Sequence, residues 1–248
     1  MIQGIHIGTS GWSYNHWQGA FYPHDLPAEE WLAYYARYLS TVEINNSFYK
    51  LPSQNTLAHW CDAVPDDFVF AVKASRYITH MKKLNEPRQT LKRFMGCVEA
   101  LGDKLGPILF QLPPRWHINI ERLAAFLKAL STDYRYALEF RDPSWFDPRV
   151  YKLLVQHSVA SCIFDLDGVL SPREITTDLV YIRLHGPGGP YQGHYDNHAL
   201  DKWADAIGRW RHEGHEVYCY FDNDEAGYAV QDAIRLQEKI SHGRRDLP

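Results

Sequence analysis

Residues 134–146 read YRYALEFRDPSWF, and this stretch decides the fold that we predict for the chain. Successive side chains of a β-strand point to opposite faces of the sheet. One face of this predicted strand is apolar, and it consists of Tyr136, Leu138 and Phe140. The other face ends in Glu139 and Arg141, so its polar side chains gather at the carboxyl end. We therefore predict a strand that packs an apolar face under helices and presents charge at its end.

Seven further segments show the same plan, and together with residues 134–141 they give eight predicted strands. Their ranges are 4–11, 41–49, 68–75, 106–112, 160–166, 179–185 and 216–221. The first of them ends in small residues, which allow a ligand or another backbone to approach closely. In several others a polar residue again lies near the carboxyl end, as with Lys73, Gln111 and Asp165.

Helical segments fill most of the intervals between these strands. Their predicted ranges are 27–39, 53–63, 89–101, 119–130, 197–213 and 227–240, and another helix begins at Asp147-Pro148. Residues 167–178 lack a helical period, so we predict that the sixth helix is short or missing. Strands that alternate with helices indicate a parallel sheet, and 248 residues are typical of a (β/α)8 domain. The predicted fold class is therefore α/β, with a single TIM barrel over residues 1–248.

Composition and charge narrow the classes of partner. The net charge is −4, which gives no global attraction to nucleic acid or to an acidic membrane. We therefore expect no generic nucleic-acid binding, although residues 76–88 form a basic loop. The first residues lack a signal peptide or a long apolar run, and the four cysteines lack a CxxC spacing. These features predict reduced thiols in a cytoplasmic protein with no membrane span.

The polar strand ends supply the candidate site, because active sites of TIM barrels form at the carboxyl ends of the strands. We expect the charged side chains to share one open, partly solvated mouth. The candidate acid and base groups are Glu139, Asp165 and His185. The candidate substrate-binding residues are Trp12, Glu43, Asn45, Tyr49, Lys73, Gln111, Arg141, Trp145, Arg183, Gly186, Asp222 and Asn223. Cations among them suit an anionic or polyhydroxylated ligand, and aromatic rings suit stacking on it.

Other readings of the same residues remain open. Glu139 and Asp165 can act as acid and base, or they can hold neighbouring cations in place. The carboxylates and His185 could also bind a divalent ion, as in a metal-dependent sugar isomerase or phosphodiesterase. Because Lys73, Arg141 and Arg183 would repel a metal in the same mouth, we predict no metal and no cofactor. A protein that binds nucleic acid or a ligand without catalysis is the non-enzymatic alternative.

The sequence also resembles a known family, the DUF72 or YecE-like proteins. The matching stretches run in order along the chain: Gly8-Thr9-Ser10-Gly11-Trp12, Val42-Glu43-Ile44-Asn45, Val72-Lys73-Ala74, Phe110-Gln111-Leu112-Pro113, Glu139-Phe140-Arg141, Arg183-Leu184-His185-Gly186 and Tyr220-Phe221-Asp222-Asn223-Asp224. The resemblance implies a TIM barrel, and it implies no particular activity because the family is one of uncharacterised function. From the residues themselves, we predict a metal-independent enzyme of the hydrolase or isomerase class. Its substrate would be a sugar-like or phosphorylated small molecule.

Overall fold

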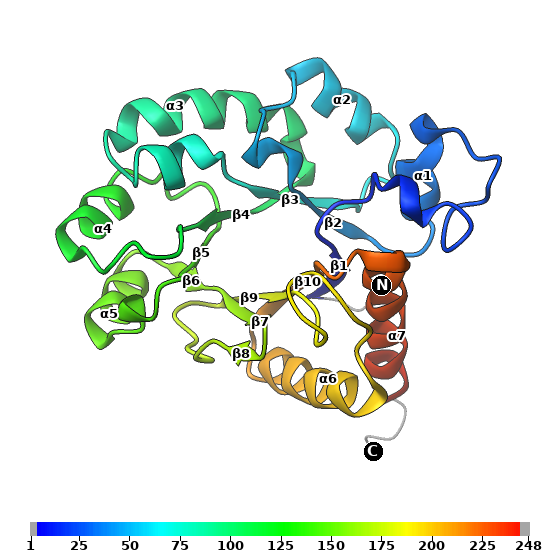
Figure 1. Cartoon of the computed structure of the whole chain (residues 1–248). Coiled ribbons are helices and arrows are strands. Elements are labelled where there is room, and N and C mark those ends of the chain that lie inside the picture. Colours follow the sequence, from blue (N-terminus) through cyan, green and yellow to red (C-terminus); the bar gives the residue numbers. More distant parts are fainter. Residues whose placement is uncertain (1–3, 244–248) are drawn as a thin grey trace. The chain divides into compact units, whose positions relative to one another are not determined.

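The computed structural model describes residues 4–243 as two compact units, each of which combines parallel strands with helices (Figure 1). The first unit contains the residues up to Glu43, Ile163–Ser171 and the residues from Val180 onward. The second unit contains Ile44–Cys162 and Pro172–Leu179. The chain therefore has the mixed α/β fold that the alternating pattern predicts.

The sheet of the first unit has the strand order β1-β10-β9-β7-β8. Its strands are β1 (Ile5–Thr9), β7 (Ile163–Leu166), β8 (Val169–Leu170), β9 (Leu179–Leu184) and β10 (Glu216–Phe221). Strand β1 pairs in parallel with β10, and β7 pairs in parallel with β9, whereas β8 runs antiparallel to β7. Parallel strands bring their carboxyl ends to the same edge, so the residues after β1 and β10 are neighbours, and so are those after β7 and β9.

The second sheet has the strand order β2-β3-β4-β5-β6. Its strands are β2 (Thr41–Ile44), β3 (Val69–Lys73), β4 (Leu105–Gln111), β5 (Tyr136–Glu139) and β6 (Val159–Ser161). From β3 to β6 each strand runs parallel to the next. The register pairs Gln111 with Glu139, so two predicted site residues are neighbours on adjacent strand ends.

Helices follow most strands. The first unit has α1 (Trp31–Tyr35), α6 (Asn197–His212) and α7 (Tyr228–Gly243), and the second has α2 (Gln54–Asp62), α3 (Pro87–Val98), α4 (Ile120–Leu127) and α5 (Pro148–Gln156). Short helical turns are η1 (Asn15–Trp17), η2 (Ala28–Glu30), η3 (Asn46–Phe48), η4 (Tyr77–Met81), η5 (Glu99–Lys104), η6 (Pro143–Trp145) and η7 (Glu225–Gly227). Side-chain oxygens of Ser53, Asn119, Asp147 and Asp196 cap α2, α4, α5 and α6 by accepting a backbone N–H of the first turn.

The sixth predicted strand is not one strand but two. Residues 160–166 divide at Cys162 into β6 of the second sheet and β7 of the first. Side chains distant in sequence fix this division: Thr176 Oγ1 accepts the N–H of Ser161, and Ser171 Oγ accepts the N–H of Phe164. The residues that follow, 167–178, contain strand β8 and no helix.

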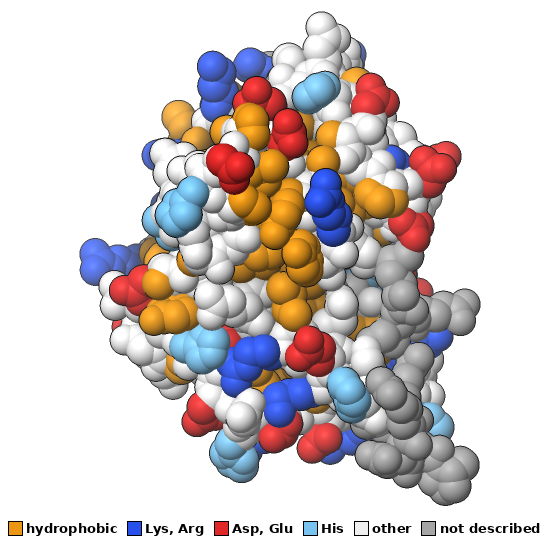
Figure 2. All heavy atoms as spheres, turned by 90° about the vertical axis from the view of Figure 1, so that its right-hand side faces the viewer, with side chains coloured by type: hydrophobic (Ala, Val, Ile, Leu, Met, Phe, Trp, Pro, Cys, Tyr) orange, Lys and Arg blue, Asp and Glu red, His pale blue; other side chains and the backbone are white. Residues whose placement is uncertain are grey.

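The interior face of the first sheet explains one glycine of the first strand. An added Cβ on Gly8 would lie 2.2 Å from the carbonyl oxygen of Thr41, so only glycine allows this approach of two backbones. On the outside of the same unit, hydrophobic side chains gather in a band on the face that carries α1 and α7 (Figure 2).

Candidate functional site

A fully buried arginine organises the strand ends of the first unit. Arg183, near the end of β9, is 0% exposed, and Glu43 of β2 is also 0% exposed. Arg183 Nε lies 3.1 Å from both carboxylate oxygens of Glu43, and Nη2 lies 2.8 Å from Glu43 Oε1. Nη2 also reaches Asp222 Oδ2 at 2.9 Å, just after β10. This geometry is a bidentate ion pair with a second carboxylate on the same guanidinium.

Glu43 is held by neutral donors as well. The hydroxyl of Tyr181 donates to Glu43 Oε2 at 2.7 Å, and the hydroxyl of Ser10 donates to Oε1 at 2.9 Å. Burying a carboxylate is costly unless its lone pairs are satisfied, and these bonds satisfy them. The expectation of a partly solvated mouth is therefore wrong for Glu43 and Arg183. Alternation along a strand predicts that a side chain points inward but does not reveal whether water reaches it.

His185 lies between the opposite charges of this network. Its Nδ1 is 2.9 Å from Asp222 Oδ2, and its Nε2 is 3.2 Å from Arg183 Nη1. Because a guanidinium can only donate, Nε2 must accept, and the proton of the neutral ring is assigned to Nδ1. The imidazole is fully buried. In this arrangement His185 orients Asp222 and Arg183, and a proton transfer to a ligand would require Arg183 to leave Nε2.

Asp165, at the end of β7, is the more accessible acid–base candidate of the first unit. It is only partly buried, and burial raises its pKa while a hydrogen bond from Tyr195 opposes the shift. The hydroxyl of Tyr195 donates to Asp165 Oδ2 at 3.2 Å and accepts the N–H of Gly186 at 3.1 Å. Tyr195 thus joins Asp165 to the glycine-rich loop after β9. A carboxyl group with a raised pKa is suited to take up and release protons closer to neutral pH.

That loop is anchored from α7. Asp232 is fully buried and accepts the N–H of Tyr195 at 3.0 Å and the side-chain amide of Asn223 at 2.9 Å. Asn223 Nδ2 also donates to the carbonyl of Gly193 at 2.7 Å. Among residues 4–243, its Oδ1 is buried and has no hydrogen-bond partner. Sequence reasoning included Asn223 but missed Asp232, because nothing in a helical period marks a residue as a loop anchor.

The second unit has its own cluster at the ends of β3, β4 and β5. Glu139 is 0% exposed, accepts a hydrogen bond from Gln111 Nε2 at 2.9 Å and pairs with Arg141 Nε through the same oxygen. Here too the expectation of a solvated carboxylate is wrong. Glu139 therefore holds Arg141 and Gln111 in place, which is one of the two roles left open by the sequence.

Lys73 and His80 lie in the same unit around an aromatic ring. Lys73 Nζ is 4.6 Å from the centre of the Phe48 ring, and the His80 ring meets Phe48 edge-to-face at 5.0 Å. Burial, followed by the charges of Lys73 and Arg76, lowers the pKa of His80 to about 4. His80 is thus a neutral imidazole at pH 7, oriented by a 2.9 Å contact of its Nδ1 with the Thr79 hydroxyl.

Sequence reasoning missed His80 because it placed the residue in a solvated basic loop. The structure instead puts His80 in η4, a π-helical turn. Such turns are rare and frequently occur at functional sites. A histidine soon after a strand end was the available signal, but the basic residues around it favoured a solvent-exposed reading.

The predicted aromatic and amide site residues differ in how far they are exposed to solvent. Tyr49 is 74% exposed, whereas Trp12 and Trp145 are buried. Trp145 stacks on Phe140 and donates its indole N–H to the carbonyl of Trp116. Asn45, directly after β2, has a buried Oδ1 with no hydrogen-bond partner among residues 4–243. An acceptor of this kind is available to a hydroxyl or amino group of a ligand.

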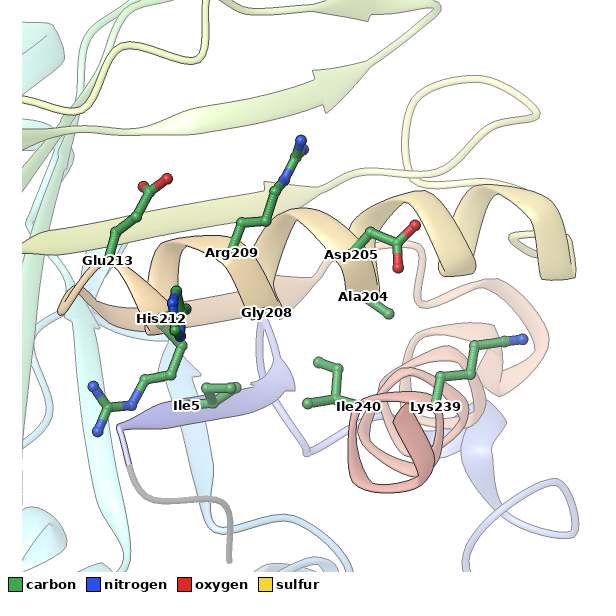
Figure 3. Close-up of a pocket in the computed structure, with 10 residues that line it drawn as sticks. Ile5, Ala204, Asp205, Gly208, Arg209, His212, Glu213, Lys239 and Ile240 are labelled. Carbon is green, nitrogen blue, oxygen red and sulfur yellow. The ribbon is translucent and has the colours of Figure 1, made fainter. Parts of the chain in front are cut away.

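A cavity of about 750 Å³ lies elsewhere in the first unit, between α6, α7 and the start of β1 (Figure 3). Ala204 and Gly208 of α6 face Ile5 and Ile240 across it, and charged side chains stand around them. No predicted site residue lines this cavity. Within residues 4–243, no group of three or more His, Cys, Asp or Glu side chains is placed to hold a metal ion. The helices described there also include none with the length and apolar character needed to cross a bilayer.

The fold and the two strand-end clusters define an α/β protein whose parallel strands carry buried ion networks at their carboxyl ends. The family described as "Protein of unknown function DUF72" matches residues 6–247. The chain belongs to this family, as its sequence motifs imply.

Two relatives align with this chain, one over most of its length and the other over part of it. The UPF0759 protein YunF of Bacillus subtilis is 24% identical over an alignment of 269 positions, which covers 95% of this chain and 94% of YunF. The UPF0759 protein YecE of Escherichia coli K12 is 30% identical over 146 positions, which covers 57% of this chain and 50% of YecE.

Solved structures show the same fold. The crystal structure of a DUF72 family protein from Thermotoga maritima is 26% identical, has a TM-score of 0.86, and matches 96% of this chain and 99% of that one. A DUF72 family protein from Enterococcus faecalis is 22% identical, has a TM-score of 0.82, and matches 96% of this chain and 95% of that one.

Proposed function

We propose that this chain is a metal-independent enzyme that acts by acid–base chemistry on a phosphorylated or polyhydroxylated small molecule. The observation that carries the proposal is the charge balance around the strand ends of the second unit. Three cations, Lys73, Arg76 and Arg141, and one carboxylate, Glu139, act on the His80 ring. Such an excess of positive charge favours an anionic group of a ligand, above all a phosphate or a carboxylate.

The positions of these side chains support a ligand site over a purely structural network. Lys73 is 9% exposed and the Arg141 side chain is 10% exposed, so both lie at the margin between the interior and water. The carboxylate that pairs with Arg141, that of Glu139, is fully buried. A buried carboxylate that holds cations at the surface of a cluster is the arrangement expected of preorganised anion recognition. The buried acceptor oxygen of Asn45 adds a position for a ligand hydroxyl.

The acid–base part of the proposal rests on each unit separately. In the first unit, Asp165 has a pKa raised by burial and is only partly buried. In the second, His80 remains neutral, so it can donate a hydrogen bond to a ligand oxygen without carrying charge. His185 acts as a positioning residue for Asp222.

We also propose that residues 1–248 form one (β/α)8 barrel, because strands and helices alternate along the chain. The cytoplasm is the location that we propose for this barrel.

Thermal unfolding with small ligands tests the anion site. The probes are inorganic phosphate, glucose 6-phosphate and glucose, each added to the wild-type chain, to Lys73→Met and to Lys128→Met. Lys128 is an exposed lysine of the same unit and serves as the matched control. We expect the phosphorylated probes to raise the melting temperature of the wild type and of the control, and to have a smaller effect on Lys73→Met. Equal shifts in all three proteins, or no shift, would refute the anion site.

Turnover is tested on whichever probe class binds. Nuclear magnetic resonance spectra of the bound compound, incubated with protein that has been treated with a chelator, should show conversion at a rate that His80→Gln, in the same unit as Lys73, lowers. A compound that binds through Lys73 but is never converted would leave a ligand-binding protein and contradict the enzymatic part. Conversion that disappears on chelation would instead favour the metal-dependent isomerase or phosphodiesterase.

A further inference from the structure

An aromatic cluster on the first unit consists of Phe21, Tyr34 and Tyr38, of which Tyr38 is exposed and the other two are partly exposed. The Phe21 ring meets the rings of Tyr34 and Tyr38 edge-to-face, each with 5.4 Å between ring centres. The hydroxyls of Tyr34 and Tyr38 are 3.2 Å apart, and Tyr38 is 44% exposed. Tyr34 belongs to α1, and Tyr38 follows that helix by three residues. Exposed aromatic clusters of this kind commonly mark an interface.

The helical stretch beneath the cluster places opposite charges at its two ends. Turn η2 leads directly into α1, and N–H groups of Arg37 and Tyr38 continue the helical bonding to the carbonyls of Tyr34 and Tyr35. Glu30 precedes α1 and Arg37 follows it, and both are exposed. Residues four and seven positions apart lie on one side at helical spacing, so we place Glu30, Tyr34 and Arg37 on the same side. Seven residues correspond to roughly 10 Å along a helix. The exposed order along this side is thus an acid, an aromatic ring and a base.

This order is self-complementary. If a second copy of the helix is laid across the first in the opposite direction, Tyr34 meets its own counterpart near the axis. Glu30 of each copy then meets Arg37 of the other, which is the pairing that a two-fold interface produces. We propose that the chain forms a symmetric homodimer through this aromatic face, with Tyr34 and Tyr38 at the centre and the two Glu30–Arg37 pairs at the sides.

Other properties of the face agree with a protein partner of this kind. The Arg37 guanidinium already lies 5.4 Å from the centre of the Tyr34 ring, so it is held where a carboxylate of the second copy would approach. Tyrosine and arginine are enriched among the residues that dominate the binding energy of interfaces. A stable interface needs roughly 1,000 Å² or more of buried surface. The face can extend onto α7, because Gln237 Nε2 contacts the carbonyl oxygen of Tyr38 at 3.4 Å.

Sedimentation velocity of the full chain over a range of concentrations tests the proposal by a charge swap. We expect the wild type to dimerise. Arg37→Glu alone and Glu30→Arg alone each place like charges opposite one another, so each should weaken the dimer by about tenfold or more. The double variant restores opposite charges and should return the dissociation constant to within a few-fold of the wild type. Arg93→Glu, at an exposed arginine of α3, is the matched control and should leave the dimer unchanged.

Three outcomes would overturn the dimer. The wild type could remain monomeric at every concentration, the single variants could leave the dimer intact, or the double variant could fail to restore it. Circular dichroism of each variant verifies that a lost dimer is not lost folding. Binding of monomeric chain to anionic lipid vesicles that depends on Tyr38 would assign the face to a membrane surface and would also refute the proposal. The assay involves no small ligand, so its result is independent of the anion site in the second unit.

Discussion

Replacement of Arg183 by methionine removes the guanidinium from two carboxylates at once. Arg183 contacts Glu43 through Nε and Nη2, and its Nη2 also contacts Asp222. Methionine fills much of the same volume but donates no hydrogen bond. Arg183 and Glu43 are both 0% exposed, so water cannot replace the lost contacts without a rearrangement of the strand ends.

The burial of this pair sets the expected magnitude. When one partner of a buried ion pair is removed, the remaining charge is left in the interior, and stability falls by about 3–5 kcal/mol. We expect Arg183→Met to lie in this range. Glu43→Gln keeps an oxygen that can accept from Ser10 or Tyr181, but it leaves Arg183 with less negative charge. The double variant removes both charges, so its loss should be smaller than the sum of the single losses by roughly 1–3 kcal/mol.

Urea unfolding of the wild type, both single variants and the double variant gives this double-mutant cycle. Tryptophan fluorescence and far-ultraviolet circular dichroism should be followed together, because coincident transitions justify a two-state free energy. Arg149→Met is the control: Arg149 pairs with Asp147 in an exposed position, and little change is expected there. Losses below about 1 kcal/mol in both single variants, or strictly additive losses, would show that the buried pair does not hold the strand ends together.

Three further predictions follow from individual residues. Burial raises the pKa of Asp165 above its ordinary 3.8, so the stability contributed by its protonated form is lost as pH rises through the folded-state pKa. Asp165→Asn should therefore be more stable to urea than the wild type at pH 7, and this difference should vanish below about pH 3.8. The ring signals of His80 in a magnetic resonance titration should report a pKa of about 4, and an ordinary value of 6.5 would contradict its burial beside Lys73. Gly8→Ala should destabilise the chain strongly, because the added Cβ would collide with a backbone carbonyl. Gly208→Ala in the open middle of α6 should instead stabilise the chain by about 1 kcal/mol, and the opposite order of melting temperatures would refute the close approach at Gly8.

Elements with strong local signals could be predicted from the sequence. Strand β5 lies inside the predicted segment 134–141, and α5 begins at Pro148 directly after Asp147, as the capping pattern indicates. These signals depend only on alternation and on a cap within a few residues. The division of β6 from β7 at Cys162 has no such local signal, because it depends on hydroxyls of Ser171 and Thr176 that lie later in the chain.

The members of the candidate site were easier to predict than their partners. Alternation placed Glu43 and Arg183 inward on separate strands, but 140 positions separate them and no local pattern predicts that they meet. Asp232 was missed for a related reason. It lies on α7, and only the folded chain brings it to the N–H of Tyr195. Pairing across such distances is a property of the sheet register and loop path, which the sequence pattern does not contain.

Burial divides the charged and titratable groups of the two strand-end clusters into two sets. Glu43, Arg183 and Glu139 are fully buried and are held by hydrogen bonds and ion pairs. Asp165, Lys73 and His80 keep some contact with water, and burial shifts the pKa values of Asp165 and His80. Because a reacting group must reach its ligand, reactivity should concentrate in the second set, and the first set should hold that chemistry in position. A substitution in the second set should therefore change ligand binding or turnover more than stability, and one in the first set should do the reverse.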